Sequence, residues 1–351
     1  MCSHATRASK SASRSHATCA SAVSVVESIA ERCDGVLRFR RYDDVGEHEP
    51  PPRAASGHNR RNSACFAGAS RWCTARADTA RSNGPGGSSS SKPARLDDTR
   101  DVSVEALAEL IRSRQPCVAL TGAGISTESG IPDFRSPTGI WAQFDPMEYA
   151  TISAFRRDPE KVWTFYAPRF GALGSAEPNA GHLALAALEE CGLLEAVITQ
   201  NIDLLHTRAG SREVIEVHGS IRQCECLACG AVYALEEVRR LLDATVVPRC
   251  TCGVVLKPGV VMFGELLPQA AIDRAYDLAR AAAILLVVGS ALEVAPVSGL
   301  PWETVQAGGE VAIVNVGPTA FDPQATLRVE GKAGEVLGAV AARLIAETRD
   351  D

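Results

Sequence analysis

Short apolar runs alternate with segments of helical periodicity along the chain from about residue 104. Apolar positions three and four residues apart predict an amphipathic helix over residues 104–111, and the apolar run at residues 117–120 predicts a buried strand. Further runs of strand length lie at residues 196–199, 214–217, 284–288 and 311–316, and further helical patterns at residues 182–190 and 269–282. Buried strands that alternate with helices are typical of a parallel sheet covered on both faces. The pattern therefore predicts an α/β fold with a Rossmann-like, doubly wound parallel sheet.

Two segments interrupt this alternation. Residues of about 141–178 have a mostly helical pattern, and residues of about 219–265 contain five cysteines. We expect these segments to form a small helical module and a zinc module, which together make a second, smaller unit. The Rossmann-like parts would then be residues of about 96–140, 179–218 and 266–347.

The first 95 residues differ in composition from the rest of the chain. They are rich in Ser, Ala and Arg and end in a Gly-Pro-Gly-Gly stretch followed by four serines, which is typical of a flexible linker. We predict that residues 1–95 are a disordered, low-complexity arm. Because residues 1–26 lack acidic side chains, an organelle transit peptide is an alternative, and a misassigned start codon would give a similar composition.

Charge and hydropathy exclude two classes of partner. The arm carries 15 Lys and Arg against 8 Asp and Glu, whereas the rest of the chain carries 21 against 34. An acidic body argues against general nucleic-acid binding. No apolar run reaches the roughly 18 to 20 residues that a membrane helix needs. We therefore expect neither a nucleic acid nor a membrane as a partner.

The cysteines outside the arm predict a metal site. Cys226 and Cys229 form one short-spaced pair, and Cys250 and Cys252 form another about twenty residues later, which is typical of a four-thiolate structural zinc site. The second pair is one residue shorter than usual, so Cys224 is an alternative ligand to Cys252. Thiolate ligands require a reducing compartment, which favours the cytoplasm, or an organelle if the arm is a transit peptide.

A candidate nucleotide site follows the first predicted strand. A glycine loop between a strand and a helix lets the main chain approach a pyrophosphate. Thr127 stands where the third glycine of the usual dinucleotide fingerprint would be, so this loop alone does not decide the ligand. A second loop contains an acid, an aromatic ring and an Arg, which can bind phosphate bidentately. The candidate cofactor residues of both loops are Gly122, Ala123, Gly124, Ile125, Ser126, Asp133, Phe134 and Arg135.

Polar residues also follow two later strands. Gln200, Asn201 and Asp203 come directly after the strand at residues 196–199, and His218 follows the strand at residues 214–217. The carboxyl ends of parallel strands are where open α/β sheets bind ligands. A histidine there titrates near neutral pH, so His218 is a candidate general base.

These motifs occur in the order and at about the spacing seen in sirtuins. The shared segments are residues 122–135, residues 199–206, His218-Gly219, the four cysteines, Phe263-Gly264-Glu265, Gly289-Ser290 and Asn315. The chain thus resembles the sirtuin family over about 250 residues. The resemblance implies a Rossmann-like domain with a helical and zinc module. It also implies an NAD-dependent deacylase that acts on acylated-lysine proteins or peptides.

The resemblance also implies roles for individual residues. His218, Asn201 and Asp203 would be catalytic, and one structural Zn²⁺ would be bound by the four cysteines. Besides the two loops above, the NAD-binding residues would be Gln200, Asn201, Ile202, Asp203, Gly289, Ser290, Asn315 and Ala333. The main chain of Val261, Phe263 and Gly264 would pair with the substrate peptide as an added strand.

The chemistry implied by the resemblance fits these residue types. The acyl oxygen would attack the ribose carbon of NAD as nicotinamide leaves, and the resulting imidate would be resolved when His218 deprotonates a ribose hydroxyl. The final products would be nicotinamide, O-acyl-ADP-ribose and free lysine. The substrate supplies the nucleophile, which agrees with the absence of a Ser-His-Asp arrangement. An NAD-dependent protein ADP-ribosyltransferase on the same fold is the alternative. A binding module without activity would not need His218, and a dehydrogenase is disfavoured by the incomplete glycine fingerprint.

One further motif concerns the acyl group. Tyr166 and Arg169 have the spacing of the sirtuins that remove succinyl and malonyl groups, and Ala150 matches the alanine that widens their acyl pocket. An Arg can bind a terminal carboxylate, and a Tyr hydroxyl can add a hydrogen bond. Residues 130–135 and 192–219 instead resemble the bacterial deacetylase branch. Acetyl and succinyl or malonyl groups are therefore both expected as candidates.

Overall fold

The computed structural model describes residues 96–347, with side chains from Ser103 onward. Residues 1–95 and 348–351 lie outside the described residues, and so does the predicted arm. No described helix is long and apolar enough to cross a membrane.

Helices and strands alternate along the described residues. The strands are β1 (Cys117–Thr121), β2 (Ala196–Thr199), β3 (Val214–Glu216), β4 (Gly219–Glu225), β5 (Val232–Ala234), β6 (Lys257–Val260), β7 (Ile284–Val288), β8 (Glu310–Asn315) and β9 (Leu327–Glu330). The α-helices are α2 (Leu96–Ser113), α3 (Pro146–Tyr149), α4 (Ile152–Arg157), α5 (Pro159–Ser175), α6 (Ala180–Glu190), α7 (Leu205–Ala209), α8 (Leu235–Ala244), α9 (Gln269–Ala281), α10 (Leu300–Gln306) and α11 (Ala333–Glu347). Short 3-10 helices lie at η2 (Ala123–Ser129), η3 (Ile140–Ala142), η4 (Val297–Gly299) and η5 (Asp322–Gln324).

Six strands form a parallel sheet in the order β3-β2-β1-β7-β8-β9, which we call the large sheet. This confirms the predicted doubly wound α/β fold. The five strands expected from apolar runs are all present in the sheet. β9 was not expected, because it is a short edge strand in which only Val329 is buried.

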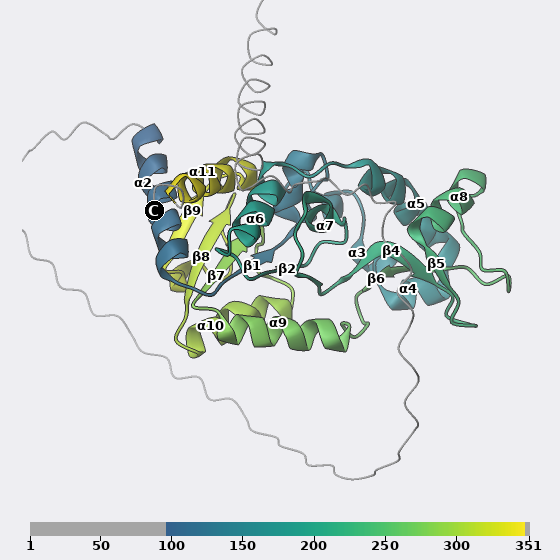
Figure 1. Cartoon of the computed structure of the whole chain (residues 1–351). Coiled ribbons are helices and arrows are strands. Elements are labelled where there is room, and N and C mark those ends of the chain that lie inside the picture. The colour runs from purple at the N-terminus through teal and green to yellow at the C-terminus, as the bar shows by residue number, and fades with distance from the viewer. Residues whose placement is uncertain (1–95, 348–351) are drawn as a thin grey trace, which may run out of the picture. The chain divides into compact units, whose positions relative to one another are not determined.

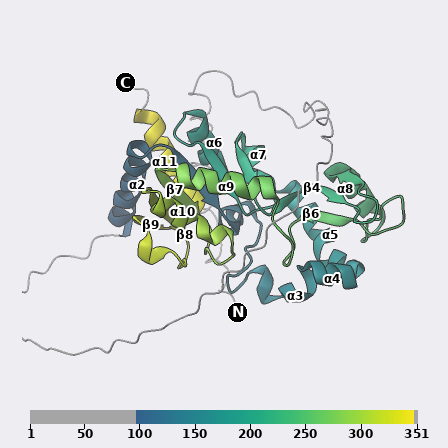
Figure 2. The ribbon, with the colours of Figure 1, turned by 90° about the horizontal axis from the view of Figure 1, so that it is seen from below.

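Helices cover both faces of the large sheet (Figure 1). Alternate residues of β1 point to opposite faces: Ala119 joins the core formed with α2, α6 and α11, whereas Val118 and Leu120 join the core formed with α9 and α10. Figure 2 shows α9 and α10 from their own side, in front of the strands. Because both faces are buried, each strand is a nearly continuous apolar run, which is why the sequence pattern revealed it.

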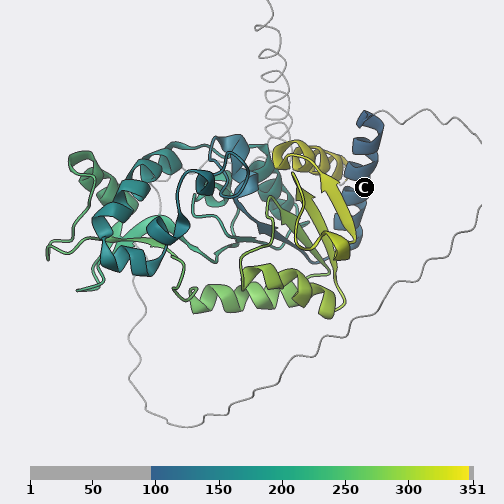
Figure 3. The same ribbon diagram turned by 180° about the vertical axis from the view of Figure 1, so that it is seen from behind.

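A second hydrophobic core lies outside the large sheet. Strands β5, β4 and β6 form an antiparallel sheet in that order, and α3, α4, α5 and α8 are adjacent (Figures 1 and 3). The indole of Trp163 in α5 is fully buried there and donates a hydrogen bond of 2.7 Å to the C=O of Leu256. We call residues 140–175 and 219–263 together the small module.

The strand order places the loops that follow β1 and β7 side by side. Chain connections leave the large sheet in opposite directions on the two sides of the β1–β7 pair, which makes this pair the topological switch point. Open α/β sheets bind ligands in the crevice at such a point, beyond the carboxyl ends of the strands.

Candidate functional site

The glycine loops after β1 and β7 touch through their main chains. The N–H of Gly122 donates to the C=O of Val288 at 3.0 Å, and the N–H of Gly124 donates to the C=O of Gly289 at 2.8 Å. A Cβ on Gly124 would lie 2.7 Å from the Cα of Gly289, and Gly289 itself has a φ of 61°. Only glycine satisfies both the close approach and the left-handed backbone at low cost. The predicted residues Gly122, Gly124, Gly289 and Ser290 are thus brought together.

Three predicted residues form a buried hydrogen-bond network beside these loops. The hydroxyl of Ser126 donates to Oδ2 of Asp203 at 2.7 Å, and the amide of Asn201 donates to Ser126 Oγ and to the C=O of Gly122, both at 3.1 Å. Burial raises the pKa of Asp203 above its ordinary value, and hydrogen bonds from the Leu205 N–H and from Ser126 oppose this rise. The network therefore fixes the orientation of a carboxyl and a carboxamide at the end of β2.

Strain in the chain accompanies this network. Leu204 has a φ of 65°, which is unfavourable for a branched side chain, and it lies between Asp203 and the start of α7. The N–H of Leu205 donates to Oδ1 of Asp203 at 2.9 Å, which holds the turn. Strained main chain of this kind is typical of functional sites.

Gln200 and His218 extend the network toward the small module. The amide of Gln200 donates to Ser290 Oγ at 2.9 Å, and Nδ1 of His218 is 3.1 Å from the C=O of Gln200. Because a C=O can only accept, Nδ1 carries the proton and Nε2 keeps its lone pair when the ring is neutral. Burial lowers the pKa of His218 below its ordinary value, although the hydrogen bond to Gln200 opposes this. The ring is thus a neutral base at pH 7.

The loop with Asp133, Phe134 and Arg135 lies at the surface side of the site. Asp133 accepts hydrogen bonds from the N–H groups of Arg135 at 3.0 Å and Ser136 at 2.7 Å, which folds the loop. Nε of Arg135 forms an ion pair of 2.9 Å with Glu293, and both side chains remain exposed. The terminal Nη groups of Arg135 are therefore the ones that remain for a phosphate.

The other predicted cofactor residues differ in how they are presented. The side chain of Ile125 is fully buried in the core of the large sheet, so only its main chain faces the glycine loops. The amide of Asn315 donates to the C=O groups of Val316 and Gly317 at 3.1 and 2.9 Å, and so holds the loop after β8. Ala333 is buried at the start of α11. Ile202 packs against the core of the small module.

The predicted substrate strand joins His218 to the helical part of the small module. The N–H of Val261 donates to the C=O of His218 at 2.8 Å. Phe263 is already paired: its N–H donates to Ala150 at 2.9 Å and its C=O accepts from Ile152 at 3.1 Å. Within residues 96–347, the C=O of Val261 and both main-chain groups of Gly264 form no main-chain hydrogen bond. These groups, rather than those of Phe263, remain for a peptide strand.

Tyr166 and Arg169 lie one turn apart on α5, near this strand. Tyr166 is buried, and burial raises the pKa of its hydroxyl above the ordinary value. The guanidinium of Arg169 lies over the ring of Phe165, 3.6 Å from its centroid, and Nη1 donates to the C=O of the same residue at 2.5 Å. Arg169 is about half-buried and forms no ion pair with any described carboxylate. Among residues 96–347 it is therefore a partly desolvated cation without a counterion.

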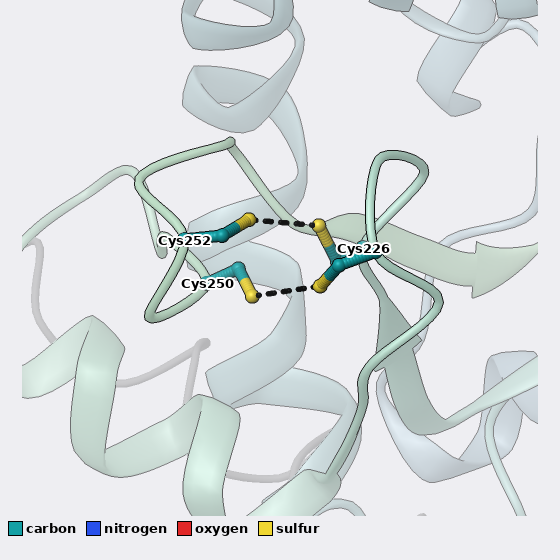
Figure 4. Close-up of side chains that lie close together, drawn as sticks. Cys226, Cys250 and Cys252 are labelled. Carbon is teal, nitrogen blue, oxygen red and sulfur yellow. Dashed lines mark hydrogen bonds between the residues drawn. The ribbon is translucent and has the colours of Figure 1, made fainter.

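The four predicted cysteine ligands lie together at one end of the small module. Their Sγ atoms are all within 4.8 Å of one another, and Cys226–Cys252 and Cys229–Cys250 are each 3.5 Å apart (Figure 4). These separations fit the edges of a tetrahedron around Zn²⁺, for which each Zn–S bond is about 2.3 Å. Cys224 is not part of the cluster. It is buried in the hydrophobic core, and burial raises the pKa of its thiol to about 12.

The turn of each cysteine pair ends in a left-handed glycine. Gly230 has a φ of 72° and Gly253 a φ of 89°. Gly253 donates its N–H to the C=O of Cys250 at 2.8 Å, and the N–H of Cys250 donates to Val254 at 2.8 Å. This tight turn is how the shorter Cys-x-Cys pair still points both sulfurs at one position.

Comparison with known proteins gives the family. The profile of the Sir2 family matches residues 122–296. The NAD-dependent protein deacylase 2 of Pyrobaculum aerophilum is 47% identical over 232 residues, which are 66% of this chain and 92% of that protein. The chain belongs to the Sir2 family. The NAD-dependent protein deacylase of Pyrococcus furiosus is 44% identical over 234 residues, which are 66% of this chain and 94% of that protein.

Solved Sir2 structures agree with this assignment. A structure described as a Sir2–p53 peptide–NAD+ complex has a TM-score of 0.63 and 41% identity, and the match covers 71% of this chain and 99% of that one. The resemblance to sirtuins and the predicted fold are therefore confirmed.

Two histidines of this Sir2 site were not assigned a role from the sequence. His182 and His206 are buried with ring centroids 4.8 Å apart, behind Ser126 and Thr121. Nε2 of His182 is 3.4 Å from Ser126 Oγ, and Nδ1 accepts from the N–H of Asn179, also at 3.4 Å. Burial lowers the pKa of His182 to about 3, so the ring stays neutral. The helix-capping Asn179 before His182 was the available signal, because a His three residues after the cap can bond back to it.

Proposed function

We propose that the chain is an NAD-dependent protein-lysine deacylase that produces nicotinamide, O-acyl-ADP-ribose and free lysine. The observation that carries the proposal is the position of His218. Its ring is bonded to the end of β2, where Asn201 and Asp203 lie, and its main chain is bonded to Val261. One neutral base thus connects the polar network at the end of β2 with the segment 261–264, in which main-chain groups stay unpaired among the described residues.

The role of each group follows from this geometry. NAD supplies an electrophilic ribose carbon with nicotinamide as the leaving group, and the acyl-lysine supplies its own oxygen nucleophile. One water is consumed when the lysine amine leaves the resulting intermediate and the acyl group stays on the ribose. His218 takes a proton from a ribose hydroxyl at Nε2, since Nδ1 already donates to Gln200. Asn201 and Asp203 orient the departing carboxamide. Hydrogen bonds with Ser126 fix their own side chains for this role. A preorganised network of this kind loses little free energy to reorganisation during the reaction.

We assign the NAD-binding surface to three groups of residues around the switch point. The phosphates would lie against the glycine loop and the Nη groups of Arg135, the nicotinamide beside the network at the end of β2, and the adenosine half beside β7 and β8. The residues are Gly122, Ala123, Gly124, Ile125, Ser126, Asp133, Phe134, Arg135, Gln200, Asn201, Ile202, Asp203, Gly289, Ser290, Asn315 and Ala333. The contact of Ile125 would be made by its main chain alone.

The substrate would be an acylated lysine in a protein or peptide. Its main chain would pair with the C=O of Val261 and with Gly264, which form no main-chain hydrogen bond within residues 96–347. We further propose that the acyl pocket accepts a carboxylate-bearing group such as succinyl or malonyl. The support is Arg169, a partly buried cation that has no carboxylate partner among the residues that the structure describes and lies one turn from Tyr166 on α5.

The zinc that the four cysteines would bind is structural. Four thiolates fill a tetrahedral ion and leave no position for a substrate or a water. Zinc thiolates persist in a reducing compartment, which supports a cytoplasmic location.

The test compares NAD cleavage with different peptides. Nicotinamide release should require an acyl-lysine peptide, and should proceed with a succinyl-lysine peptide at least as fast as with an acetyl-lysine peptide. An unmodified lysine peptide is the control. Nicotinamide release that is independent of the acyl group, with ADP-ribose transferred to protein, would instead identify an ADP-ribosyltransferase.

A further inference from the structure

A buried lysine contacts the segment that we propose binds the substrate peptide. The side chain of Lys257 in β6 is only 4% exposed. Its Nζ donates to the C=O groups of Pro258 and Val260, each at 3.0 Å, and lies 3.1 Å from Oε2 of Glu265. Glu225 is farther away, at 3.7 Å. An ammonium has three N–H donors, so these three short contacts satisfy it completely.

The contacts of Lys257 close a loop around the peptide-binding residues. Glu265 accepts the N–H of Met262 at 2.8 Å through the same carboxylate oxygen that binds Lys257, and its own N–H donates to the C=O of Met262 at 2.9 Å. Val260, at the other end, precedes Val261, whose N–H is bonded to His218. The ammonium of Lys257 therefore contacts both ends of the segment 260–265, namely Val260 and Glu265.

Burial of the Lys257 ammonium lowers the stability of the fold unless its contacts have a role in residues 260–265. Burying an ammonium costs several kcal/mol that its partners must offset, and an apolar side chain of similar length would fill the same space without that cost. What the apolar side chain would not do is hold two carbonyls and a carboxylate at fixed positions. Gly264, with a φ of 88°, lies within the segment that is held.

We propose that Lys257 is a positioning residue for the acylated peptide, acting through Glu265 and Val260 to hold the main chain of Val261 and Gly264 in the peptide-binding conformation. This inference rests on the proposed deacylase function. It concerns the peptide side alone. The network of Ser126, Asn201 and Asp203 has no contact with Lys257 and is held by its own hydrogen bonds.

Steady-state kinetics of Lys257→Met tests the proposal. KM for the acyl-lysine peptide should rise about tenfold, while KM for NAD stays within about twofold and kcat within about threefold. The NAD side and the His218 ring, which is bonded to Gln200, should be unaffected. Hydrogen exchange of the Val261 and Met262 amides should be at least tenfold faster, with no change in β7.

Two further variants make the test decisive. Glu265→Gln keeps an acceptor for the Met262 N–H and loses the charge, so KM for the peptide should rise about threefold. This variant decides the question if Lys257→Met does not fold. Lys161→Met is the matched control, because Lys161 forms an exposed ion pair with Glu148 in the same module, and its kinetic constants should stay within about twofold.

Three results overturn the proposal. An unchanged peptide KM in Lys257→Met and Glu265→Gln would show that residues 260–265 keep the peptide-binding conformation without the Lys257–Glu265 contact. Equal increases in KM for peptide and NAD would indicate general structural damage. A wild-type protein that releases no nicotinamide with any acyl peptide would overturn the proposed function itself, and would be recognised before either variant is made.

Discussion

The large sheet differs from the cysteine-containing end of the small module in how much apolar surface it buries. In the large sheet, strands such as β1 and β7 are buried on both faces, and every residue of β7 is buried. In the small module, β5 has three residues, and Leu227, Val232 and Val246 are 49%, 56% and 55% exposed. A region that buries so little apolar surface at one end needs another source of stability, and a zinc ion bound by the four cysteines would supply it there.

The two regions also differ in how their polar side chains are paired. Ser126, Asn201 and Asp203 at the end of the large sheet are all hydrogen-bonded to protein groups. Arg169 in the small module has a C=O partner and two aromatic neighbours but no carboxylate partner among the described residues. The network at the end of the large sheet is therefore satisfied within the protein, whereas the small module keeps a cation that no described carboxylate neutralises.

Removal of a zinc ligand should have the largest effect of the variants considered, because it should affect the small module alone. Cys252→Ala should lose the metal and unfold β4, β5 and β6 while the large sheet stays folded, because apparent zinc-binding energies of about 10 to 16 kcal/mol make such sites part of folding. Zinc content by elemental analysis and hydrogen exchange would measure this. Cys224→Ala is the matched control and should keep one zinc, since Cys224 lies outside the cluster. Full zinc in Cys252→Ala, or none in fresh wild-type protein, would contradict the ligand set.

His218→Ala removes the base that connects the two regions. Turnover should fall on the order of a hundredfold or more, the usual scale for a general base, while NAD and peptide binding stay nearly intact. Single-turnover kinetics and isothermal calorimetry would separate the two effects. Turnover within about threefold of wild type would remove His218 from the mechanism.

Arg169→Met tests the role of the partly buried guanidinium in the small module. The succinyl reaction should slow by roughly tenfold to a hundredfold, about 1.4 to 2.8 kcal/mol, because the distal carboxylate loses its cation. The acetyl reaction should be spared, since acetyl has no group for Arg169 to bind. Arg157→Met, an exposed cation on the preceding helix, is the control. Equal losses on both substrates would indicate damage to α5 instead.

His182 makes the large-sheet side sensitive to acid. Its pKa is about 3 in the folded protein and about 6.5 when unfolded, so below pH 6.5 the unfolded state binds the extra proton. Stability is therefore fully present above about pH 6.5 and is lost as pH falls. Between pH 7.5 and 5.5, the loss attributable to His182 should be about 1.4 kcal/mol.

Urea unfolding of wild type and His182→Gln at the two pH values would measure this difference. Gln retains one donor and one acceptor but does not titrate. The variant should therefore lose about 1.4 kcal/mol less than wild type over this range. Equal losses in both proteins would show that His182 is not the group responsible.

The parts of the fold that the sequence revealed are those whose signal is local. Each central strand of the large sheet is an apolar run, because both of its faces are buried. The antiparallel sheet was not predicted, because β4 pairs with β6, which lies more than thirty residues later, and the turns between them depend on the cysteine cluster. The edge strand β9 has one buried residue and gave too weak a pattern.

The same limit applies to the site. The positions of Asn201, Asp203 and His218 were predictable because these residues follow strands, and the sheet brings strand ends together. The burial of Lys257 was not predictable from the sequence, since a lysine beside Pro and Gly is usually solvated and only the fold buries it. The stacking of Arg169 on Phe165 likewise depends on packing that no sequence spacing specifies.

The most direct test of the account is the stoichiometry of a single turnover, followed by mass spectrometry with NAD and a succinyl-lysine or acetyl-lysine peptide. Nicotinamide, O-acyl-ADP-ribose and the peptide with free lysine should appear in equal amounts, and His218→Ala should form them at least a hundredfold more slowly. Nicotinamide formed without loss of the acyl group from the peptide, or formed at the same rate by His218→Ala, would contradict it.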